Sequence, residues 1–308
     1  MDLHQLMILR ELGDRGSVVA VARALFVTPS AVSQHLSALQ RDVAVALTEK
    51  RGRTLALTPA GAALARAAAG VSVAMAEAES ALDAFREQSA APVTLAGFHS
   101  AGYAWFAALT VALRDRGAPP IQFSDEDVPR DGFAALVADY DLVIAHRVGH
   151  EQQWPEHLAV TPLISEPFDV AVPRGHPLAE RTALTVADVV DERWISPHRG
   201  FPVAGALDVV AVAAGRPLNI VHRINEFFVA GSVVASGDAL ALMPRHTMKP
   251  GPDAGYVLRP FDTLRVGREI DVLSRPEALL RASVRIVRDA LQSVATAATE
   301  RPAGHLGE

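Results

Sequence analysis

The sequence of 308 residues contains no cysteine. This absence excludes disulfide frameworks, thiolate metal sites and cysteine nucleophiles. Half of the residues are hydrophobic, yet no uninterrupted apolar run reaches the roughly 18 residues that a membrane span needs. The first residues, MDLHQLMILRELGDRG, alternate charged and apolar side chains and lack the pattern of a secretory signal. We therefore expect a soluble, cytoplasmic protein with no membrane partner.

Charge is distributed unevenly along the chain, whose net charge is −6. Residues 1–66 contain eight Lys and Arg and five Asp and Glu, a net charge of +3, which leaves −9 for the remainder. A positive end on an acidic protein indicates that this end meets a polyanion while the rest of the molecule is kept away from it.

The N-terminal residues predict two short helices separated by a glycine-containing loop. Asp2 and Gln5 are spaced as a capping box for a first helix that runs through about Leu12, and Gly13 to Gly16 would end it. Ser17 would cap the second helix, VVAVARALF.

A third helix follows after only two or three residues. Thr28 is its expected cap, and Pro29 stands at the first helical position, where proline is tolerated. Two short helices joined this tightly predict a helix-turn-helix. The segment after it, KRGRTLALTPAG, combines a basic turn with alternating leucines and predicts a small hairpin or wing.

The polar side of the third helix differs from an ordinary solvated surface. Its apolar side carries Val32, Leu36 and Leu39, whereas the opposite side carries Ser30, Ser33, Gln34 and Ser37. A solvated face would more often carry Glu and Lys. Small hydroxyls and an amide are suited to contacts with base edges, although an ordinary exposed helix is the alternative interpretation.

A helix in the major groove places its first two turns nearest the bases. Gln34 can then pair bidentately with adenine, Ser33 can serve either base type, and Pro29 can contact a thymine methyl group. Helix-start amides and wing arginines suit phosphates, and His35 is either a flanking residue or a phosphate contact. The candidate DNA-binding residues are Ser17, Thr28, Pro29, Ser30, Ser33, Gln34, His35, Arg51 and Arg53.

An alanine-rich segment predicts a long helix from Pro59 to about Gln88. Apolar residues recur in it at intervals of four and three, the spacing of a coiled-coil seam. The seam residues are Leu64, Ala68, Val71, Met75, Ala78, Leu82 and Phe85. Because a lone helix would expose this stripe, we expect it to mediate dimerisation. The alternative is a helix packed on its own domain, since Gly70 and the two alanines weaken the seam.

From Pro92 onward, short apolar strands alternate with helices. The expected strands are VTLAGF, IQFSD, DLVIAH, LAVTPL, FDVAVP, RWISP, LNIVHRI, ALALMP and IDVLS, and a closing helix is expected from about Pro276 to Ala298. This alternation predicts parallel α/β sheets with sites at the carboxyl ends of the strands. Nine strands in this length suggest two lobes with a cleft between them.

The order of these motifs resembles the LysR-type transcriptional regulators. The family pattern opens the second helix with glycine and serine and continues through an apolar turn, a recognition helix, a wing and a Thr-Pro-Ala-Gly sequence. This pattern aligns with Gly16 to Gly61 without gaps. The matching residues are Ser17, Ala22, Leu25, Val27, Pro29 to Val32, Ser33, Leu39, Leu47, Arg53, Leu57, Thr58 and Gly61. Further on, PLISEPFDVAVPRGHPLA resembles the strand and His-Pro-Leu-Ala turn that open the second lobe, and ASGDALALMPR resembles a late glycine turn and buried strand.

Several positions depart from the family pattern. Val21 stands where a second alanine is common, and Gln40 replaces the usual glutamate. Ala44, Thr48 and Lys50 replace a glycine, a phenylalanine and an arginine. These substitutions surround the helix ends and the base of the wing.

The resemblance implies an α+β multi-domain fold. Residues 1–58 would form a winged helix-turn-helix DNA-binding domain, and residues 59–90 a linker helix that pairs two chains. Residues 91–300 would form a two-lobed, periplasmic-binding-protein-like effector domain, with lobe I at 92–163 plus 268–300 and lobe II at 164–267. The implied function is a transcriptional regulator that binds double-stranded DNA, senses a small-molecule effector and assembles as a homodimer or homotetramer.

The resemblance also places the effector in the cleft between the lobes. The candidate effector-binding residues are His99, Ser100, Ala101, His146, Arg147, Ser196, Pro197, His198, Phe201, Glu226 and Phe227. The Ser100 hydroxyl and the following amides would hold a carboxylate, with Arg147 or His198 as the counter-charge, and Glu226 would hold an amino group. We therefore expect an amino acid or another carboxylate, although loop or cap roles are an equal alternative for each residue.

The main alternative is a serine hydrolase that uses Ser100, because GFHSAG follows an apolar strand and opens a helix. It misses the G-x-S-x-G elbow, since Phe98 occupies the place of the first glycine. His146 and His150 are four residues apart and could share a metal, but Gly149 and the expected loop position argue against this. A transport-type binding protein would share the two lobes but need export. We expect no enzyme activity, no catalytic or metal site and no cofactor.

Overall fold

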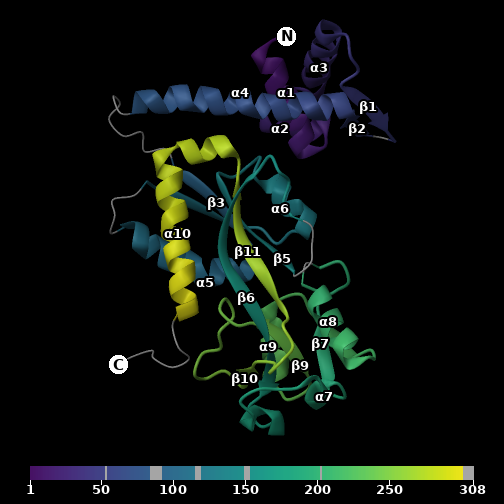
Figure 1. The fold of residues 1–308 in the computed structure, drawn as a ribbon, viewed down its shortest axis with the longest axis vertical. Coiled ribbons are helices and arrows are strands. Elements are labelled where there is room, and N and C mark those ends of the chain that lie inside the picture. Colours follow the sequence, from purple (N-terminus) through teal and green to yellow (C-terminus); the bar gives the residue numbers. More distant parts are fainter. Residues whose placement is uncertain (53, 84–91, 115–118, 149–152, 202, 301–308) are drawn as a thin grey trace.

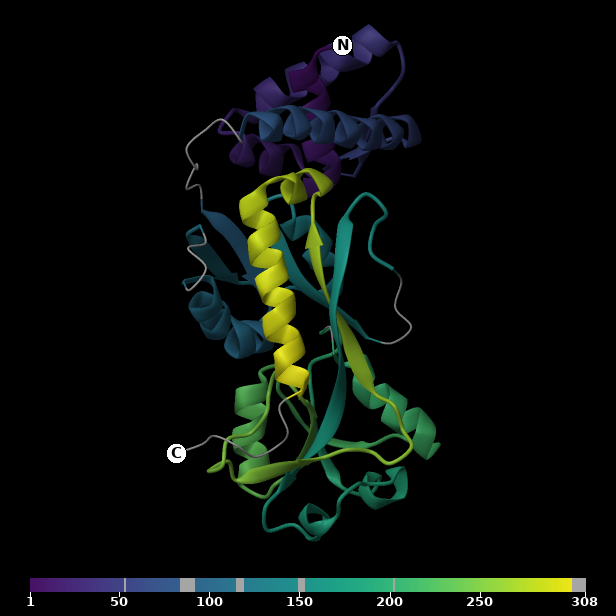
Figure 2. The same cartoon turned by 60° about the vertical axis from the view of Figure 1, so that its left-hand side comes forward.

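The computed structural model describes the chain except residues 53, 84–91, 115–118, 149–152, 202 and 301–308. Three bodies follow one another along the longest axis, namely the N-terminal helices, a central lobe and a lower lobe (Figure 2). The predicted α+β architecture, a winged helix-turn-helix followed by a long helix and a two-lobed α/β domain, is confirmed.

The N-terminal body consists of α1 (Leu3–Arg15), α2 (Val18–Ala24), α3 (Pro29–Val43), β1 (Thr48–Arg51) and β2 (Thr54–Leu57). Both predicted caps are present, because Ser17 Oγ accepts from the Ala20 amide at 3.1 Å and Thr28 Oγ1 accepts from the Ala31 amide at 3.2 Å. Helix α1 extends beyond the predicted end at Leu12, since the residue in the left-handed conformation that ends it is Gly16.

Two departures from the family pattern turn out to contact each other. Gln40 Oε1, on α3, accepts from the amides of Leu47 and Thr48 at 2.8 and 3.1 Å and lies 3.3 Å from Thr48 Oγ1. Hydrogen bonds therefore tie the base of the wing to α3.

A third departure, Ala44, ends α3 with a φ of 54°. In this left-handed region the Cβ atom of an L-residue crowds the following carbonyl oxygen, at a cost of roughly 1–2 kcal/mol. We expect Ala44→Gly to raise the stability of the N-terminal domain by about 1 kcal/mol, since the relief exceeds the added freedom of the unfolded chain. The melting temperature should rise by several degrees, measured by circular dichroism.

Ala46→Gly provides the matched control, because Ala46 is exposed in the same loop and its φ is not positive. This change adds the same backbone freedom to the unfolded chain without relieving strain, and should lower the melting temperature slightly. A fall of similar size for Ala44→Gly would contradict the expected relief of strain.

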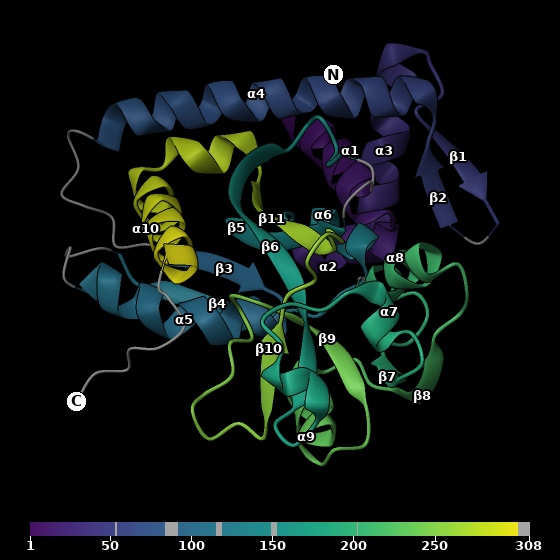
Figure 3. The same cartoon turned by 60° about the horizontal axis from the view of Figure 1, so that its bottom comes forward.

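Helix α4 (Pro59–Asp83) lies across the molecule, with the N-terminal helices packed at one end (Figure 3). Residues 84–88 of the predicted helix lie outside the described residues. Within its own chain, α4 packs mainly on α1, where Ser72 Oγ donates to Met7 Sδ at 3.2 Å, and on η2 (Pro276–Leu280), where Ser80 Oγ donates to the Leu280 carbonyl at 3.4 Å.

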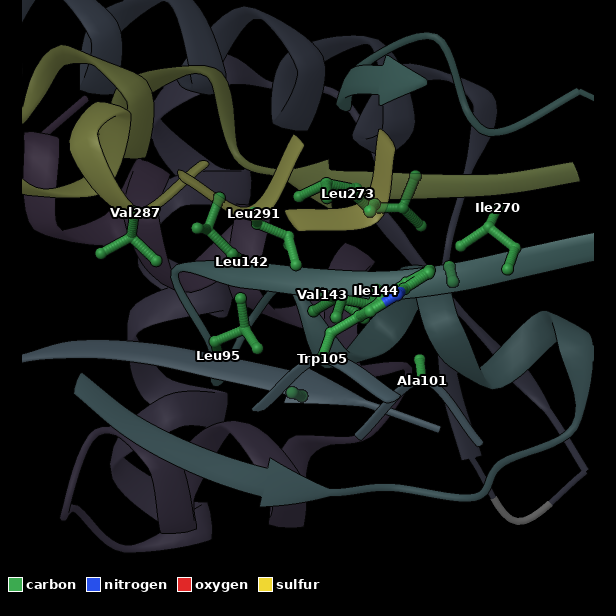
Figure 4. Close-up of a cluster of buried hydrophobic side chains, with 14 of the residues drawn as sticks. Leu95, Ala101, Trp105, Leu142, Val143, Ile144, Ile270, Leu273, Val287 and Leu291 are labelled. Atoms are coloured by element: carbon green, nitrogen blue, oxygen red, sulfur yellow. The ribbon is translucent and has the colours of Figure 1, made fainter. Parts of the chain in front are cut away.

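The central lobe is a mixed sheet rather than the wholly parallel sheet expected. Strand β3 pairs in parallel with β4 and β5, but β11 is antiparallel to both β5 and β6. Its elements are β3 (Val93–Gly97), α5 (His99–Arg114), β4 (Ile121–Asp125), α6 (Arg130–Leu136), β5 (Leu142–Val148), the first half of β6 (Ala159–Pro173), β11 (Gly267–Ser274) and α10 (Ala282–Glu300). Figure 4 shows the core between the sheet and the helices, which includes Leu95, Trp105, Ile144, Leu273 and Leu291.

The lower lobe continues the sheet from the second half of β6, in the strand order β4-β3-β5-β11-β6-β9-β7-β8, with β10 also paired to β6. Its elements are η1 (Pro177–Glu180), α7 (Val186–Val189), β7 (Arg193–Ser196), α8 (Gly205–Ala214), β8 (Asn219–Arg223), α9 (Phe227–Ala235), β9 (Leu240–Pro244) and β10 (Tyr256–Arg259). Strands β6 and β11 run side by side between the two lobes (Figure 1).

Three details of the effector domain differ from the expected elements. LAVTPL and FDVAVP form one strand, β6, because its two halves pair with different partners and Pro167 interrupts the apolar pattern without ending the strand. Strand β10 was not expected. The closing helix is divided into η2 and α10, because Arg281 between them has an extended backbone.

Ion pairs attach the N-terminal body to the central lobe. Arg275, just before η2, contacts Glu11 and Asp14 of α1 at 2.6 Å each, and Arg10 contacts Glu277 at 2.6 Å. Arg10 and Glu11 are buried. The charged residues on this side of α1 therefore serve a contact between domains.

Candidate functional sites

The two sides of α3 divide as the spacing predicted. Val32, Leu36 and Leu39 are buried in the core of the N-terminal body. The exposed side carries Pro29, Ser30, Ser33, Gln34 and Ser37. Ser33 Oγ donates to the Pro29 carbonyl at 2.9 Å, and Thr28 Oγ1 lies 3.1 Å from Ser30 Oγ. Gln34 thus presents a longer polar side chain between shorter hydroxyl groups.

The remaining DNA-binding candidates lie at the margins of this surface. His35 is half-buried, with its ring edge-on to His4 at 4.9 Å, so it lies away from the exposed side of α3. Arg51, on the wing, is exposed and pairs with Glu49 at 2.9 Å. Arg53 lies outside the described residues.

Phe26 is an exposed residue beside α3 that the sequence did not single out. It is 95% exposed in the turn between α2 and α3, with a φ of 55°. An exposed aromatic ring in a strained turn next to a candidate reading helix is a further candidate contact, and only its exposure could have identified it.

The predicted seam on α4 divides into two parts. Leu64 and Ala68 pack into the core of their own N-terminal body, as the alternative interpretation had it for the whole helix. Val71 and Met75, 38% and 45% exposed, and Ala78 are exposed in the described structure. Nothing is described of the Leu82 side chain, and Phe85 lies outside the described residues. Only 17% of an 18-residue apolar stretch within Pro59–Ala81 is buried within the chain.

A pocket lies between the two lobes at the carboxyl ends of β3, β4, β5 and β8. Of the predicted effector-binding residues, the structure brings together His99, Ser100, His146, Phe201, Glu226 and Phe227. The sequence did not identify the other lining residues, which are Phe98, Asp127, Val203, Asn225 and Arg268.

His99 lies at the centre of an acidic group in this pocket. Its Nε2 lies 3.0 Å from Asp125 Oδ2, and its Nδ1 lies 3.5 Å from Asp127 Oδ2 and 3.4 Å from Glu226 Oε1. His99 and the aspartates belong to the central lobe, whereas Glu226 caps α9 of the lower lobe. Partial burial raises the pKa of Asp127 and Asp125 adds to the rise, whereas His99 opposes it.

Arg268 forms the floor of the pocket and is buried with Glu166. Its Nη2 donates to Glu166 Oε2 at 2.7 Å, to Ser100 Oγ at 2.9 Å and to Thr247 Oγ1 at 3.0 Å. Glu166 Oε1 accepts from the amides of His246 and Thr247. Burial lowers the pKa of Arg268, and Glu166 opposes this effect. The buried Arg268 charge therefore depends on the Glu166 carboxylate as its partner.

His146 forms the inner wall of the pocket. It is 3% exposed, its ring packs edge-on against Phe98 and Phe133, and its Nδ1 has no hydrogen-bond partner among the described residues. Burial lowers the pKa of His146 well below its ordinary value, and the charge of Arg268 adds to the effect. The imidazole is therefore neutral.

The other five predicted effector-binding residues do not line this pocket. Ala101 is buried in the core of the central lobe. Arg147 Nε lies 3.3 Å from Asp271 Oδ2. It leaves the sheet on the opposite face from His146, its neighbour in β5. The counter-charge expected from Arg147 is therefore absent beside Ser100.

Ser196, Pro197 and His198 follow β7 on the lower lobe. Ser196 Oγ accepts from Arg223 Nη1 at 2.9 Å, and the His198 amide donates to the Asn225 side chain at 2.9 Å. Ser196 lines a second groove of about 910 Å³ that shares Phe201 with the pocket and also contains Arg199 and Arg223. Arg199 and Arg223 thus lie in the groove, whereas three carboxylates surround His99 in the pocket.

Both parts of the chain match models of known protein families. Residues 3–62 match the bacterial regulatory helix-turn-helix protein, lysR family, and residues 86–296 match the LysR substrate binding domain.

Individual relatives and solved structures match over most of the chain. The regulator CbbR of Xanthobacter flavus is 28% identical over 254 residues, which are 80% of this chain and 73% of CbbR. Full-length OxyR from Pseudomonas aeruginosa has a TM-score of 0.66 at 19% identity, over 96% of this chain and 97% of that one. ArgP from Mycobacterium tuberculosis has a TM-score of 0.63 at 22% identity, over 95% of this chain and 96% of that one.

Proposed function

Because the chain belongs to the LysR family of bacterial transcriptional regulators, we propose that α3 reads the major groove of double-stranded DNA while the pocket between the lobes binds the effector. The protein is a DNA-binding transcriptional regulator with an effector-binding domain, and its relatives are regulators rather than hydrolases. Ser100 is buried and its hydroxyl accepts from Arg268. This arrangement gives no support to a nucleophilic role.

We propose that the side chains that contact the base edges are Pro29, Ser30, Ser33 and Gln34. Support comes from the exposure of these side chains on the first two turns of α3. Ser17 and Thr28 at the helix starts, His35 at the flank and Arg51 and Arg53 on the wing are proposed to contact phosphates. Arg10 is buried against Glu277 and takes no part.

The test is a titration of the regulator's own promoter duplex and of a random duplex at several salt concentrations. We expect Gln34→Ala to lose about 1–3 kcal/mol of discrimination, because a bidentate base contact is removed. Arg51→Ala should weaken binding to both duplexes equally and reduce the salt slope by about one.

His222→Ala is a suitable control for this titration, because His222 pairs with Asp238 on the lower lobe, away from α3. It should leave both affinities unchanged. Equal affinity of the unmodified protein for promoter and random duplex would overturn the proposal.

The proposed assembly is a homodimer, with a homotetramer as the further possibility, formed through α4. Support comes from the exposed apolar surface on α4 around Val71, Met75 and Ala78. By length and composition α4 could also span a membrane. In the proposed dimer, the second copy of the chain covers the apolar surface of α4. We therefore propose a cytoplasmic location without a membrane partner.

For the effector, the proposal keeps His99, Ser100, His146, Phe201, Glu226 and Phe227 as pocket residues. Ala101, Arg147, Ser196, Pro197 and His198 would then support the pocket or the adjoining groove. The expectation of an amino acid or another carboxylate loses its support at Ser100 and Arg147, since Arg268 and Asp271 engage these two side chains. The domain boundaries at residues 58 and 90, and the lobe boundaries at 163 and 267, are retained as proposals.

A further inference from the structure

The arrangement around His99 places its Nδ1 close to two carboxylates. When Nε2 carries the single ring proton and donates it to Asp125, 3.0 Å away, Nδ1 has a lone pair that can bind a metal ion. Asp127 and Glu226 approach that same Nδ1 at 3.5 and 3.4 Å. Three electron-donating atoms therefore converge on one point between the lobes.

The spacing of these atoms fits a metal ion. The ligand atoms of His99, Asp127 and Glu226 all lie within 4.8 Å of one another. Two ligands at about 2.1 Å from a tetrahedral ion are roughly 3.4 Å apart, close to the 3.5 and 3.4 Å that separate His99 Nδ1 from Asp127 and Glu226. A carboxylate that orients the ring of a metal-bound histidine, as Asp125 orients His99, is the usual arrangement around such sites.

The wall of the same pocket provides a second, independent observation. His146 is 97% buried, lines the pocket and has no hydrogen-bond partner for Nδ1 among the described residues. A buried polar atom without a partner carries a cost in free energy, and such groups in native structures often mark a site for water or an ion.

We propose that the effector pocket binds a divalent first-row transition-metal ion through His99 Nδ1, Asp127 and Glu226, with Asp125 orienting His99. The inference rests on the proposed function, because the pocket is taken to be the effector site. One nitrogen and two carboxylate oxygens suit Zn²⁺, Mn²⁺, Fe²⁺ or Co²⁺. His99 and Asp127 come from the central lobe and Glu226 from the lower lobe, so the ion would bridge the two lobes and favour their closure.

The experiment uses the full-length protein, stripped with EDTA and dialysed. Zn²⁺ and Mn²⁺ binding is measured by equilibrium dialysis with elemental analysis, and Co²⁺ binding by its visible absorption. We expect saturable binding of a single ion per chain and a raised melting temperature with metal. His99→Ala and the isosteric Glu226→Gln should each lower the affinity at least about 100-fold, and Asp125→Asn roughly 10- to 100-fold.

His222→Ala is the matched control, since His222 is also partly exposed and pairs with a carboxylate, Asp238, at 2.6 Å. It should bind metal as the unmodified protein does. The metal proposal is overturned if no ion binds, or if His99→Ala and His222→Ala bind equally. It is also overturned if lysine or a diamine raises the melting temperature while metals do not.

The promoter titration on the same metal-free sample separates this inference from the proposed function. Preference for the promoter duplex without metal binding would reject the metal site alone. Absence of both would reject the proposed function as well.

Discussion

Glu166→Gln is expected to destabilise the effector domain by about 3–5 kcal/mol, the typical cost of removing one partner from a buried ion pair. The Glu166 and Arg268 side chains are 0% and 1% exposed. Water therefore cannot solvate the Arg268 charge once its partner is removed. Arg268 Nε and Nη2 both donate to Glu166 Oε2, and the amides of His246 and Thr247 donate to Oε1. A glutamine has a single acceptor oxygen for these donors, and its amide group would face some of them.

Urea unfolding followed by tryptophan fluorescence measures this effect, because Trp105, Trp154 and Trp194 all lie in the effector domain. The unfolding midpoint should fall strongly for Glu166→Gln. The double variant Glu166→Leu with Arg268→Met should recover much of the loss, since apolar residues of similar size can replace a buried ion pair.

Glu269→Gln is the control. Glu269 follows Arg268 in β11, and its carboxylate accepts a hydrogen bond from Ser165 in an exposed position. This substitution should change stability by no more than about 0.5 kcal/mol. If Glu166→Gln unfolded at the same urea concentration as Glu269→Gln, Glu166 would not be the essential counter-charge of Arg268.

The N-terminal domain could be predicted in detail because its signals are local. The caps at Ser17 and Thr28 and the proline at position 29 each act within one helical turn, and the structure contains both caps. The contact between Gln40 and Thr48 could not be predicted from the sequence, because it forms only when the folded chain brings the wing back against α3. For this reason two apparent departures from the family pattern could not be recognised as a pair.

The pocket could be predicted only in part. The sequence placed His99, His146 and Glu226 at strand ends, where the structure has them in one pocket. Arg268 and Asp127 were missed, because nothing nearby in the sequence distinguishes them. Arg268 reaches the pocket since β11 returns beside β5 and β6 after more than a hundred residues.

The alternation of side chains along a strand also explains why Arg147 does not line the pocket. The sequence treated His146 and Arg147 together as effector-binding residues at the end of one strand. Successive side chains of a strand point to opposite faces, so only one of the two can face the pocket. Burial then decides between them, because the His146 ring fits among Phe98 and Phe133 whereas Arg147 pairs with Asp271 on the other face.

Met75→Glu is expected to break the proposed dimer and, with it, most of the affinity for the promoter. Met75 is 45% exposed at the centre of the apolar surface of α4, and two-fold symmetry would bring two new carboxylates, one from each chain, into the interface. Burying an unpaired charge costs several kcal/mol, so the dimer dissociation constant should rise at least about 100-fold. Two linked half-site contacts gain about 10²–10⁴ in affinity over one, and the variant should lose a factor in this range.

Ala81→Glu adds the same charge to an exposed position of α4 outside the predicted seam, so it controls for repulsion between the added charge and DNA. Analytical ultracentrifugation at micromolar concentration should show a monomer for Met75→Glu and an oligomer for Ala81→Glu and the unmodified protein. Promoter affinity at fixed salt should follow the same order. An oligomer that survived Met75→Glu with unchanged affinity would require another surface to pair the α3 helices, because a single exposed α3 cannot read two half-sites at once.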